Sequence, residues 1–202
     1  MPTETDGTFA DELEAWLRGD GPKTLGSLET VFEEKTFATT ILFLMFLPAL
    51  PLPTGGLTHL FEAITVVVAG QMVLGRRTMW LPEKWKRREL GALTTEKAIP
   101  FMVRWVRRFE RFSRPRGVRI FEQRWSLRLL GLLLIVFAVA AGLAPPFSGL
   151  DTLPAMGAVI VALSIILGDV VILGIGAAIG LGGAALIVTI GAAVVRFVQN
   201  LV

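Results

Sequence analysis

Apolar residues along the chain are gathered into five blocks. The first covers 37–52 and, after a Pro/Gly-rich break, the second covers 57–75. The third covers 127–144 and, after a similar break, the fourth covers 150–168; the fifth covers 170–195. A helix needs about 20 apolar residues to cross a hydrocarbon core of about 30 Å. The blocks therefore predict an all-α, polytopic membrane protein with about four to six membrane helices or re-entrant half-helices.

Two features of these blocks leave the number of crossings open. Pro48, Pro51 and Pro53 kink or end the first helix near its far end, so the first two blocks form either a hairpin that crosses and returns or a re-entrant hairpin. Glycines in the middle of 170–195 allow either one C-terminal helix or a broken pair. They also offer a small surface for close helix packing.

Three further helices are expected outside the blocks. Residues 8–18 predict a short helix that Thr8 caps, and a second short helix is expected over 26–35. Over 97–114 the apolar spacing predicts a helix with arginines along its sides. We expect this helix to lie in the headgroup plane, to pack on the protein's own base, or to do both. The apolar stripe expected on it is Ala98, Met102, Trp105, Phe109 and Phe112.

The chain matches itself when it is offset by 93 residues. Pro53, Gly56, Leu74 and Gly75 fall on Pro146, Gly149, Leu167 and Gly168, together with several apolar matches between them. The paired Pro and Gly positions indicate two related helix–break–helix units followed by a Gly-rich C-terminal helix. Broken helices at matching positions of two halves are a pointer to a membrane binding site.

Charge is divided unevenly along the chain. Residues 76–128 carry sixteen Lys and Arg against five Glu, a net charge of +11, whereas residues 1–36 carry a net charge of −6. The positive-inside rule places 76–128, and with it the N-terminus, in the cytoplasm, so the two units are expected to be parallel copies. The expected parts are 1–36 (acidic amphipathic helices), 37–75 (first hairpin), 76–128 (basic segment), 129–168 (second hairpin) and 169–202 (C-terminal helix or helix pair).

The composition excludes several kinds of site. The chain has no Cys and one His, so thiolate chemistry and a histidine metal cluster within one chain are excluded. No Walker loop, dinucleotide fingerprint, HExxH or Ser/His/Asp pattern is present. We therefore expect no enzyme activity, no cofactor and no metal. Since membrane orientation already accounts for the basic block, we expect no nucleic-acid binding.

Glu62 is the acidic residue well inside an apolar block, and an intramembrane carboxylate is costly enough to suggest function. His59 precedes it by one helical turn, so the pair is expected to relay a proton or to bind a cationic or hydroxyl-rich headgroup. The alternative is that both residues are hydrated near the far interface. Further candidates for the substrate or proton site are Gln71, Asp151 and Asp169, and candidates for phosphate or headgroup binding are Arg76, Arg77, Arg114 and Arg116.

The run 51–82, PLPTGGLTHLFEAITVVVAGQMVLGRRTMWLP, resembles the first signature of the ExoD family of exopolysaccharide-synthesis proteins. The pieces FERFSRPR (109–116), PPFSGLDTLPA (145–155) and LGD (167–169) also resemble it. The resemblance implies a bacterial inner-membrane protein linked to exopolysaccharide production.

Two functions follow as hypotheses. One is a carrier or flippase-like protein for a polyprenyl-phosphate or glycolipid intermediate. The other is an accessory subunit of a polysaccharide synthase or export complex. The expected partners are membrane lipids with anionic headgroups, a polyprenyl-phosphate-linked glycan and other assembly proteins; a homo-oligomer stays open. A cavity lined by Glu62 and His59 favours the carrier, and a solid bundle with a long apolar groove favours the accessory subunit.

Overall fold

The structure is a computed structural model that describes residues 7–32, 35–50, 57–76, 78–87, 99–145 and 148–200. Over these ranges the chain forms ten α-helices and no β-strand, which confirms the expected all-α class. The helices are α1 (Phe9–Arg18), α2 (Leu25–Val31), α3 (Thr36–Phe46), α4 (Leu57–Val73), α5 (Glu83–Lys86), α6 (Ile99–Phe112), α7 (Val118–Glu122), α8 (Arg124–Leu143), α9 (Thr152–Leu167) and α10 (Val170–Gln199).

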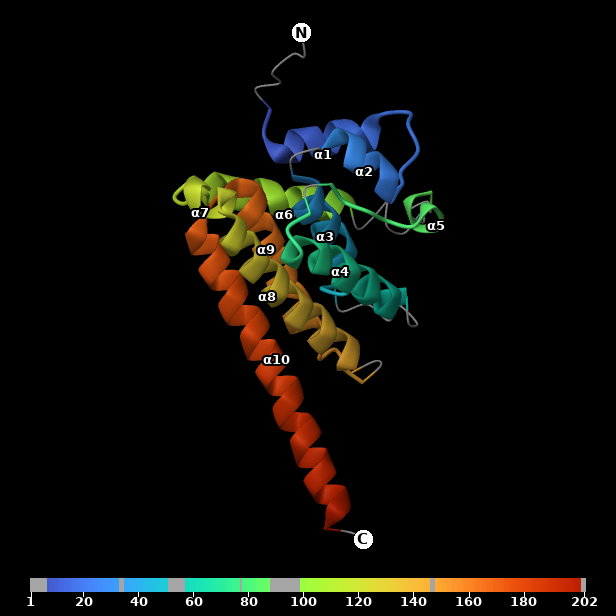
Figure 1. Cartoon of the computed structure of the whole chain (residues 1–202), viewed down its shortest axis with the longest axis vertical. Helices are drawn as coiled ribbons and strands as arrows, with labels where there is room; N and C mark the ends of the chain where they lie inside the picture. The colour runs from blue at the N-terminus through green and yellow to red at the C-terminus, as the bar shows by residue number, and fades with distance from the viewer. Residues whose placement is uncertain are drawn as a thin grey trace.

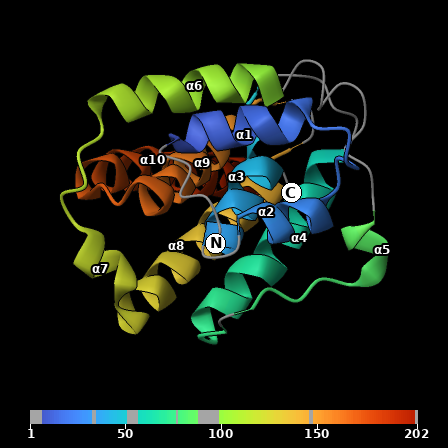
Figure 2. The same cartoon turned by 90° about the horizontal axis from the view of Figure 1, so that it is seen from above.

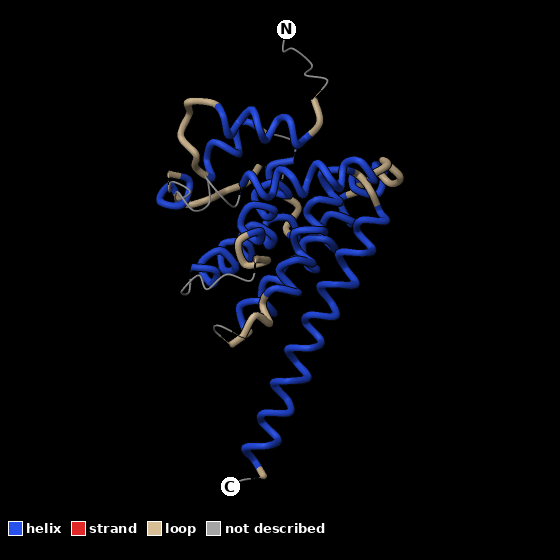
Figure 3. The backbone as a smooth tube through the Cα atoms, turned by 180° about the vertical axis from the view of Figure 1, so that it is seen from behind, coloured by secondary structure: helices blue, strands red, loops and turns tan. Residues whose placement is uncertain are grey.

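The helices form two parts (Figure 1). The cap, made of α1, α2, α5, α6 and α7, lies across one end, and the bundle, made of α3, α4, α8, α9 and α10, runs away from it. Seen from above, α1 and α6 lie side by side across the bundle (Figure 2). α10 continues past the other helices to the C-terminus, as the view from behind also shows (Figure 3).

The expected helix over 8–18 is α1, and the threonine before it caps it in a capping box. The backbone N–H of Ala10 donates to Glu110 of α6 at 3.0 Å. Arg107 of α6 forms ion pairs with Asp11 at 2.9 Å and with Glu14 at 2.7 Å. Acidic residues of the N-terminal segment thus neutralise part of the basic segment and hold α1 on α6.

The expected apolar stripe of α6 is wrong in its details. Met102 is buried as expected, but Trp105 and Phe112 of that stripe are 41% and 75% exposed. Ala98 lies outside the described residues. The face that α6 buries is made of Ile99, Met102, Val103 and Val106. α6 therefore packs on the protein's own base and carries a second, aromatic surface beside its buried face.

α3 and α9 form the centre of the bundle. α3 has 11 residues and buries ten of them, because α2, α4 and α9 surround it. α9 buries most of its length between α3, α8 and α10. A helix that is apolar all round is expected in such a position, so the lack of a polar face in these segments reflects their neighbours.

The bundle is built from two hairpins, α3 with α4 and α8 with α9, and each helix of one hairpin packs on a helix of the other: α3 on α9 and α4 on α8. α4 and α9 end alike. Gly75 and Gly168, which are 93 residues apart, both have left-handed backbone angles (φ 72° and 67°). The N–H after each glycine bonds back to a carbonyl five residues earlier, at 3.0 and 3.1 Å. The first break at 51–56 and residues 146–147 of the second lie outside the described residues, so the repeat stays a prediction.

α10 is one continuous helix, which decides between the two expectations for 170–195. Its 30 residues extend about 45 Å at 1.5 Å per residue. The glycines provide contact surface and do not break the helix: a Cβ on Gly176 would lie 2.9 Å from the Val161 backbone of α9. A Cβ on Gly183 would lie 2.7 Å from Leu153 Cβ. Small residues let α10 approach α9 closely.

Two described helices, over Arg124–Leu143 and Val170–Ala193, are long and apolar enough to cross a membrane by length and composition. Three shorter apolar helices accompany them, over Thr36–Phe46, Thr58–Val73 and Thr152–Leu167. With 11 residues, α3 extends only about 16 Å, well short of a bilayer core. The expected count of four to six membrane segments therefore stays a prediction.

Candidate functional site

Glu62 is buried in the bundle on α4, with 2% of its surface exposed. Its Oε2 atom lies 2.8 Å from Nδ1 of His59, one turn earlier, as the i, i+3 spacing predicts. The other carboxylate atom, Oε1, is buried and has no hydrogen-bond partner among the described residues. The His59 side chain is 42% exposed. The pair thus joins a buried carboxylate to an imidazole that reaches the surface.

α8 faces this carboxylate with a glycine. A Cβ on Gly142 would lie 3.3 Å from Glu62 Oε2, so the absent side chain leaves room for the carboxylate between the two hairpins. Asp151, at the N-terminus of α9, is close enough to add its negative charge to the field at Glu62. These residues belong to the first half of α4, the C-terminal end of α8 and the start of α9, and those helix ends point away from the cap (Figure 1). The Glu62–His59 pair can exchange a proton through the imidazole, and Glu62 Oε1 can accept a hydrogen bond from a hydroxyl or an amine.

Gln71 lies at the other end of α4, where it anchors a loop. Its amide Nε2 donates to the Trp80 carbonyl at 2.8 Å, and its Oε1 accepts from the Trp80 N–H at 2.7 Å. The side chain therefore pairs with Trp80 as a backbone peptide would. Both polar ends of this buried amide are used, and the geometry assigns it a structural task.

Asp169, in the turn between α9 and α10, is 1% exposed. Its carboxylate accepts from the N–H of Val171 at 2.9 Å, which caps α10, and from the N–H of Arg114 at 2.9 Å. Burial acts to raise the pKa of Asp169, but backbone N–H groups of Arg114, Val171 and Ile172 and the charge of Arg116 outweigh it and hold the pKa below its usual value. Asp169 thus ties the segment after α6 to the start of α10.

The four arginines proposed for phosphate binding lie at the cap end or outside the described residues. Arg114 and Arg116 are exposed beside the Asp169 turn, and Arg76 is exposed just after α4. Arg77 lies outside the described residues. The structure therefore divides the described candidates into two groups, with Glu62, His59 and Asp151 away from the cap and Gln71, Asp169, Arg76, Arg114 and Arg116 toward it. A role in binding stays a prediction for each of them.

Two features of the candidate sites were not predicted from the sequence. Gly142 has no signature, because a glycine in an apolar helix gives no sign of what it faces. The second is a crevice between α3, α6 and α9, beside which Arg104 and Arg108 lie. Their i, i+4 spacing was a signal, but the sequence alone does not tell which side of α6 is covered by α1.

Comparisons with known proteins agree with the resemblance in the sequence. The family described as "Exopolysaccharide synthesis, ExoD" matches residues 9–189. The chain is 28% identical over 132 residues to "Uncharacterized protein slr1875" of Synechocystis sp., a match that covers 65% of this chain and 61% of the relative. No solved structure matches the chain. Since the family match covers most of the chain, the protein belongs to the ExoD family of exopolysaccharide-synthesis proteins.

Proposed function

We propose that the chain is a multi-pass protein of the bacterial inner membrane, with its cap in the cytoplasm. The surface of α8 and α10 supports this. Within the apolar stretch Val170–Ala193 of α10, only 22% of the most hydrophobic segment is buried against the rest of the protein. Large apolar side chains such as Leu181 and Val188 are exposed. A soluble protein rarely exposes so long an apolar face, whereas lipid would cover it. The helices α5, α6 and α7, which belong to the +11 segment, lie at the cap end, in agreement with the positive-inside rule.

Within that membrane, the function that the geometry supports best is a carrier for a lipid-linked intermediate of exopolysaccharide synthesis, with no catalytic step of its own. The observation that carries it is Glu62. A buried carboxylate in an apolar bundle is costly, and one of its oxygens has no partner among the described residues. A hydroxyl of a glycan, or a proton exchanged through His59, would complete that hydrogen bonding.

The two hairpins supply the frame for such a carrier. We propose that they are copies of one unit, related by rotation about an axis near the membrane normal. The matching ends of α4 and α9 support this, as do the packing pairs α3–α9 and α4–α8, which such a rotation would exchange. Glu62 and Gly142 lie where the hairpins meet, which is the expected place for a substrate site in a duplicated transporter.

Replacement of the carboxylate tests this function. In a strain that depends on this protein, we expect Glu62→Gln to lower exopolysaccharide output while the protein level in the membrane is unchanged, because the amide keeps the size and polarity of the side chain. Glu83→Gln is the matched control, since Glu83 lies in the cap and its side chain is 73% exposed. Full output from a well-expressed Glu62→Gln variant would remove the carboxylate from the mechanism.

An accessory subunit that organises a synthase or export complex is the second candidate. The observation in its favour is the apolar crevice between α3, α6 and α9, the kind of groove that we expected of such a subunit. This function predicts normal output from Glu62→Gln and loss of output when the cap is altered. The same pair of Glu variants therefore separates the two candidates.

Topology has its own test. With single cysteines at positions 20 and 90 of this cysteine-free chain, a membrane-impermeant thiol reagent added to intact spheroplasts should label neither position until the membrane is opened. Labelling of position 90 from the periplasmic side would overturn both the orientation and the parallel arrangement of the hairpins.

A further inference from the structure

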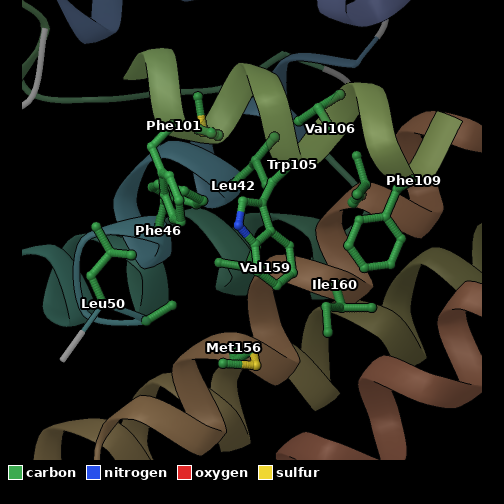
Figure 4. Close-up of a pocket in the computed structure, with 13 residues that line it drawn as sticks. Leu42, Phe46, Leu50, Phe101, Trp105, Val106, Phe109, Met156, Val159 and Ile160 are labelled. Carbon is green, nitrogen blue, oxygen red and sulfur yellow. The ribbon is translucent and has the colours of Figure 1, made fainter. Parts of the chain in front are cut away.

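A narrow apolar crevice lies beneath α6, between α3 and α9 (Figure 4). Its thirteen lining residues are all apolar. α9 lines it with Met156, Val159, Ile160 and Leu163, an i, i+3, i+4, i+7 row that extends about 10 Å along the helix. The apolar lining suits a hydrocarbon chain, and the indole N–H of Trp105 is the single hydrogen-bond donor among the thirteen side chains.

A row of aromatic rings on α6 forms one wall of this crevice. Trp105 hangs from α6 toward Val159, with Phe101 and Phe109 on its two sides (Figure 4). Its ring centroid is 6.2 Å from that of Phe101 and 5.9 Å from that of Phe109. Phe46 of α3 continues the row at 6.1 Å from Phe101. This is the aromatic surface that α6 carries beside its buried face.

The same three α6 rings also line a second, open hollow on the surface of α6. Arg104 and Arg108 lie in its wall, one helical turn apart and both exposed. Arg107, on another side of the helix, is paired with two carboxylates of α1. Arg104 and Arg108 form no ion pair within the described part of the chain, and Arg104 lies 5.7 Å from the ring centroid of Phe101. Two guanidinium groups so placed can bind a phosphate by charge-assisted hydrogen bonds.

We propose that these two adjoining hollows bind one anionic phospholipid of the surrounding bilayer. Arg104 and Arg108 hold its phosphate, and one acyl chain passes the aromatic row and lies in the crevice along α3 and α9. The charge fits, because Arg104 and Arg108, which have no acidic partner among the described residues, lie beside the apolar crevice where the cap meets the bundle. The proposal rests on the membrane location proposed above but not on the carrier role or on Glu62.

Trp105 is a built-in reporter for this site. Acyl chains brominated along their length quench tryptophan fluorescence on contact. We therefore consider a protein whose Trp80, Trp85 and Trp125 are changed to Phe, placed in bilayer discs of phosphatidylcholine. Brominated phosphatidylglycerol or brominated phosphatidylcholine is added as a minor component. Trp16, buried in the cap, gives a constant background.

We expect half-maximal quenching of Trp105 at a lower mole fraction of brominated phosphatidylglycerol than of brominated phosphatidylcholine. The ratio of the two mole fractions should be about fivefold for each arginine that binds the headgroup. Arg104→Gln with Arg108→Gln should abolish the preference, whereas the control pair Arg119→Gln with Arg124→Gln should keep it. Val159→Phe, which fills the crevice, should weaken quenching by both lipids. A parallel protein that keeps Trp125 and carries Trp105→Phe should show no comparable preference, because Trp125 reports the bulk bilayer.

Other outcomes overturn the proposal. Equal quenching of Trp105 by the two brominated lipids would mean ordinary bilayer contact. Displacement of brominated phosphatidylglycerol by traces of a polyprenyl phosphate would assign the site to that lipid. If neither brominated lipid quenched Trp105 in the correctly inserted protein, a segment of protein would fill the crevice. Each of these results leaves the Glu62 experiment unaffected, whereas recovery of the chain in the soluble fraction would refute both proposals.

Discussion

The docking of α10 on α8 makes a sharp prediction at Gly180. A Cβ at this position would lie 2.3 Å from two ring carbons of Phe137, whereas ordinary carbon contacts are about 3.5–4.0 Å. Phe137 is fully buried and cannot swing away without moving its neighbours. Gly180→Ala must therefore push α10 from α8 by more than about 1 Å or strain the ring. Overpacking of this kind costs about 1–3 kcal/mol.

The same helix provides the control. A Cβ on Gly182, two residues further, would meet nothing within 4 Å. Gly182→Ala and Gly180→Ala gain the same helix propensity, up to about 1 kcal/mol in water, so that gain cancels when the variants are compared. The full overpacking cost of about 1–3 kcal/mol should remain as the difference between them.

The assay is reversible unfolding in mixed micelles titrated with a denaturing detergent, with the free energy of unfolding extracted for both variants and the wild type. We expect the order Gly182→Ala at or above wild type, and Gly180→Ala below Gly182→Ala. Equal stabilities for the two variants would refute the close contact between α10 and Phe137.

Two further predictions concern the polar contacts at the cap end. Gln71→Leu removes both bonds to Trp80 and leaves that backbone unpaired, so it should cost about 1–3 kcal/mol and hasten protease cleavage within 78–87; an unchanged cleavage rate would contradict the anchoring role. The lowered pKa of Asp169 means that its contribution to stability is present above its unfolded pKa of about 4 and is lost as pH falls through its folded pKa. Asp169→Asn should therefore be less stable than wild type at neutral pH, with a difference that shrinks on acidification. A difference that does not change with pH would show that the charge of Asp169 is not what matters.

Local periodicity and end signals determined much of this protein at the level of the sequence. The all-α class, the capped N-terminal helix and the hairpin positions all follow from residues within one or two turns of each other. The His59–Glu62 contact belongs to this group, since an i, i+3 spacing on a helix places two side chains together whatever the rest of the chain does. Gly75 and Gly168 do as well, because left-handed residues at helix ends favour glycine.

The tertiary structure decided which surface of each helix is covered. The sequence of α6 is compatible with several apolar stripes, and the packing of α1 and the bundle selected Ile99, Met102, Val103 and Val106. The glycines of α10 permitted a break, but close contact with α8 and α9 uses them as flat surface in one unbroken helix. Helices such as α3, α9 and α10 are apolar on all sides, so their hydrophobicity does not tell which side of each helix packs on a neighbouring helix.

The candidate site divides in the same way. Polarity in an apolar block was enough to single out Glu62, Gln71 and Asp169, but their tasks depend on partners that are distant in sequence. Trp80 uses both ends of the Gln71 amide, and Arg114 and Val171 donate to Asp169, so those two groups are occupied within the fold. Glu62 instead meets Gly142, which has no side chain to offer, and keeps one oxygen without a partner among the described residues. Such differences depend on contacts across tens of residues, which only packing in three dimensions brings together.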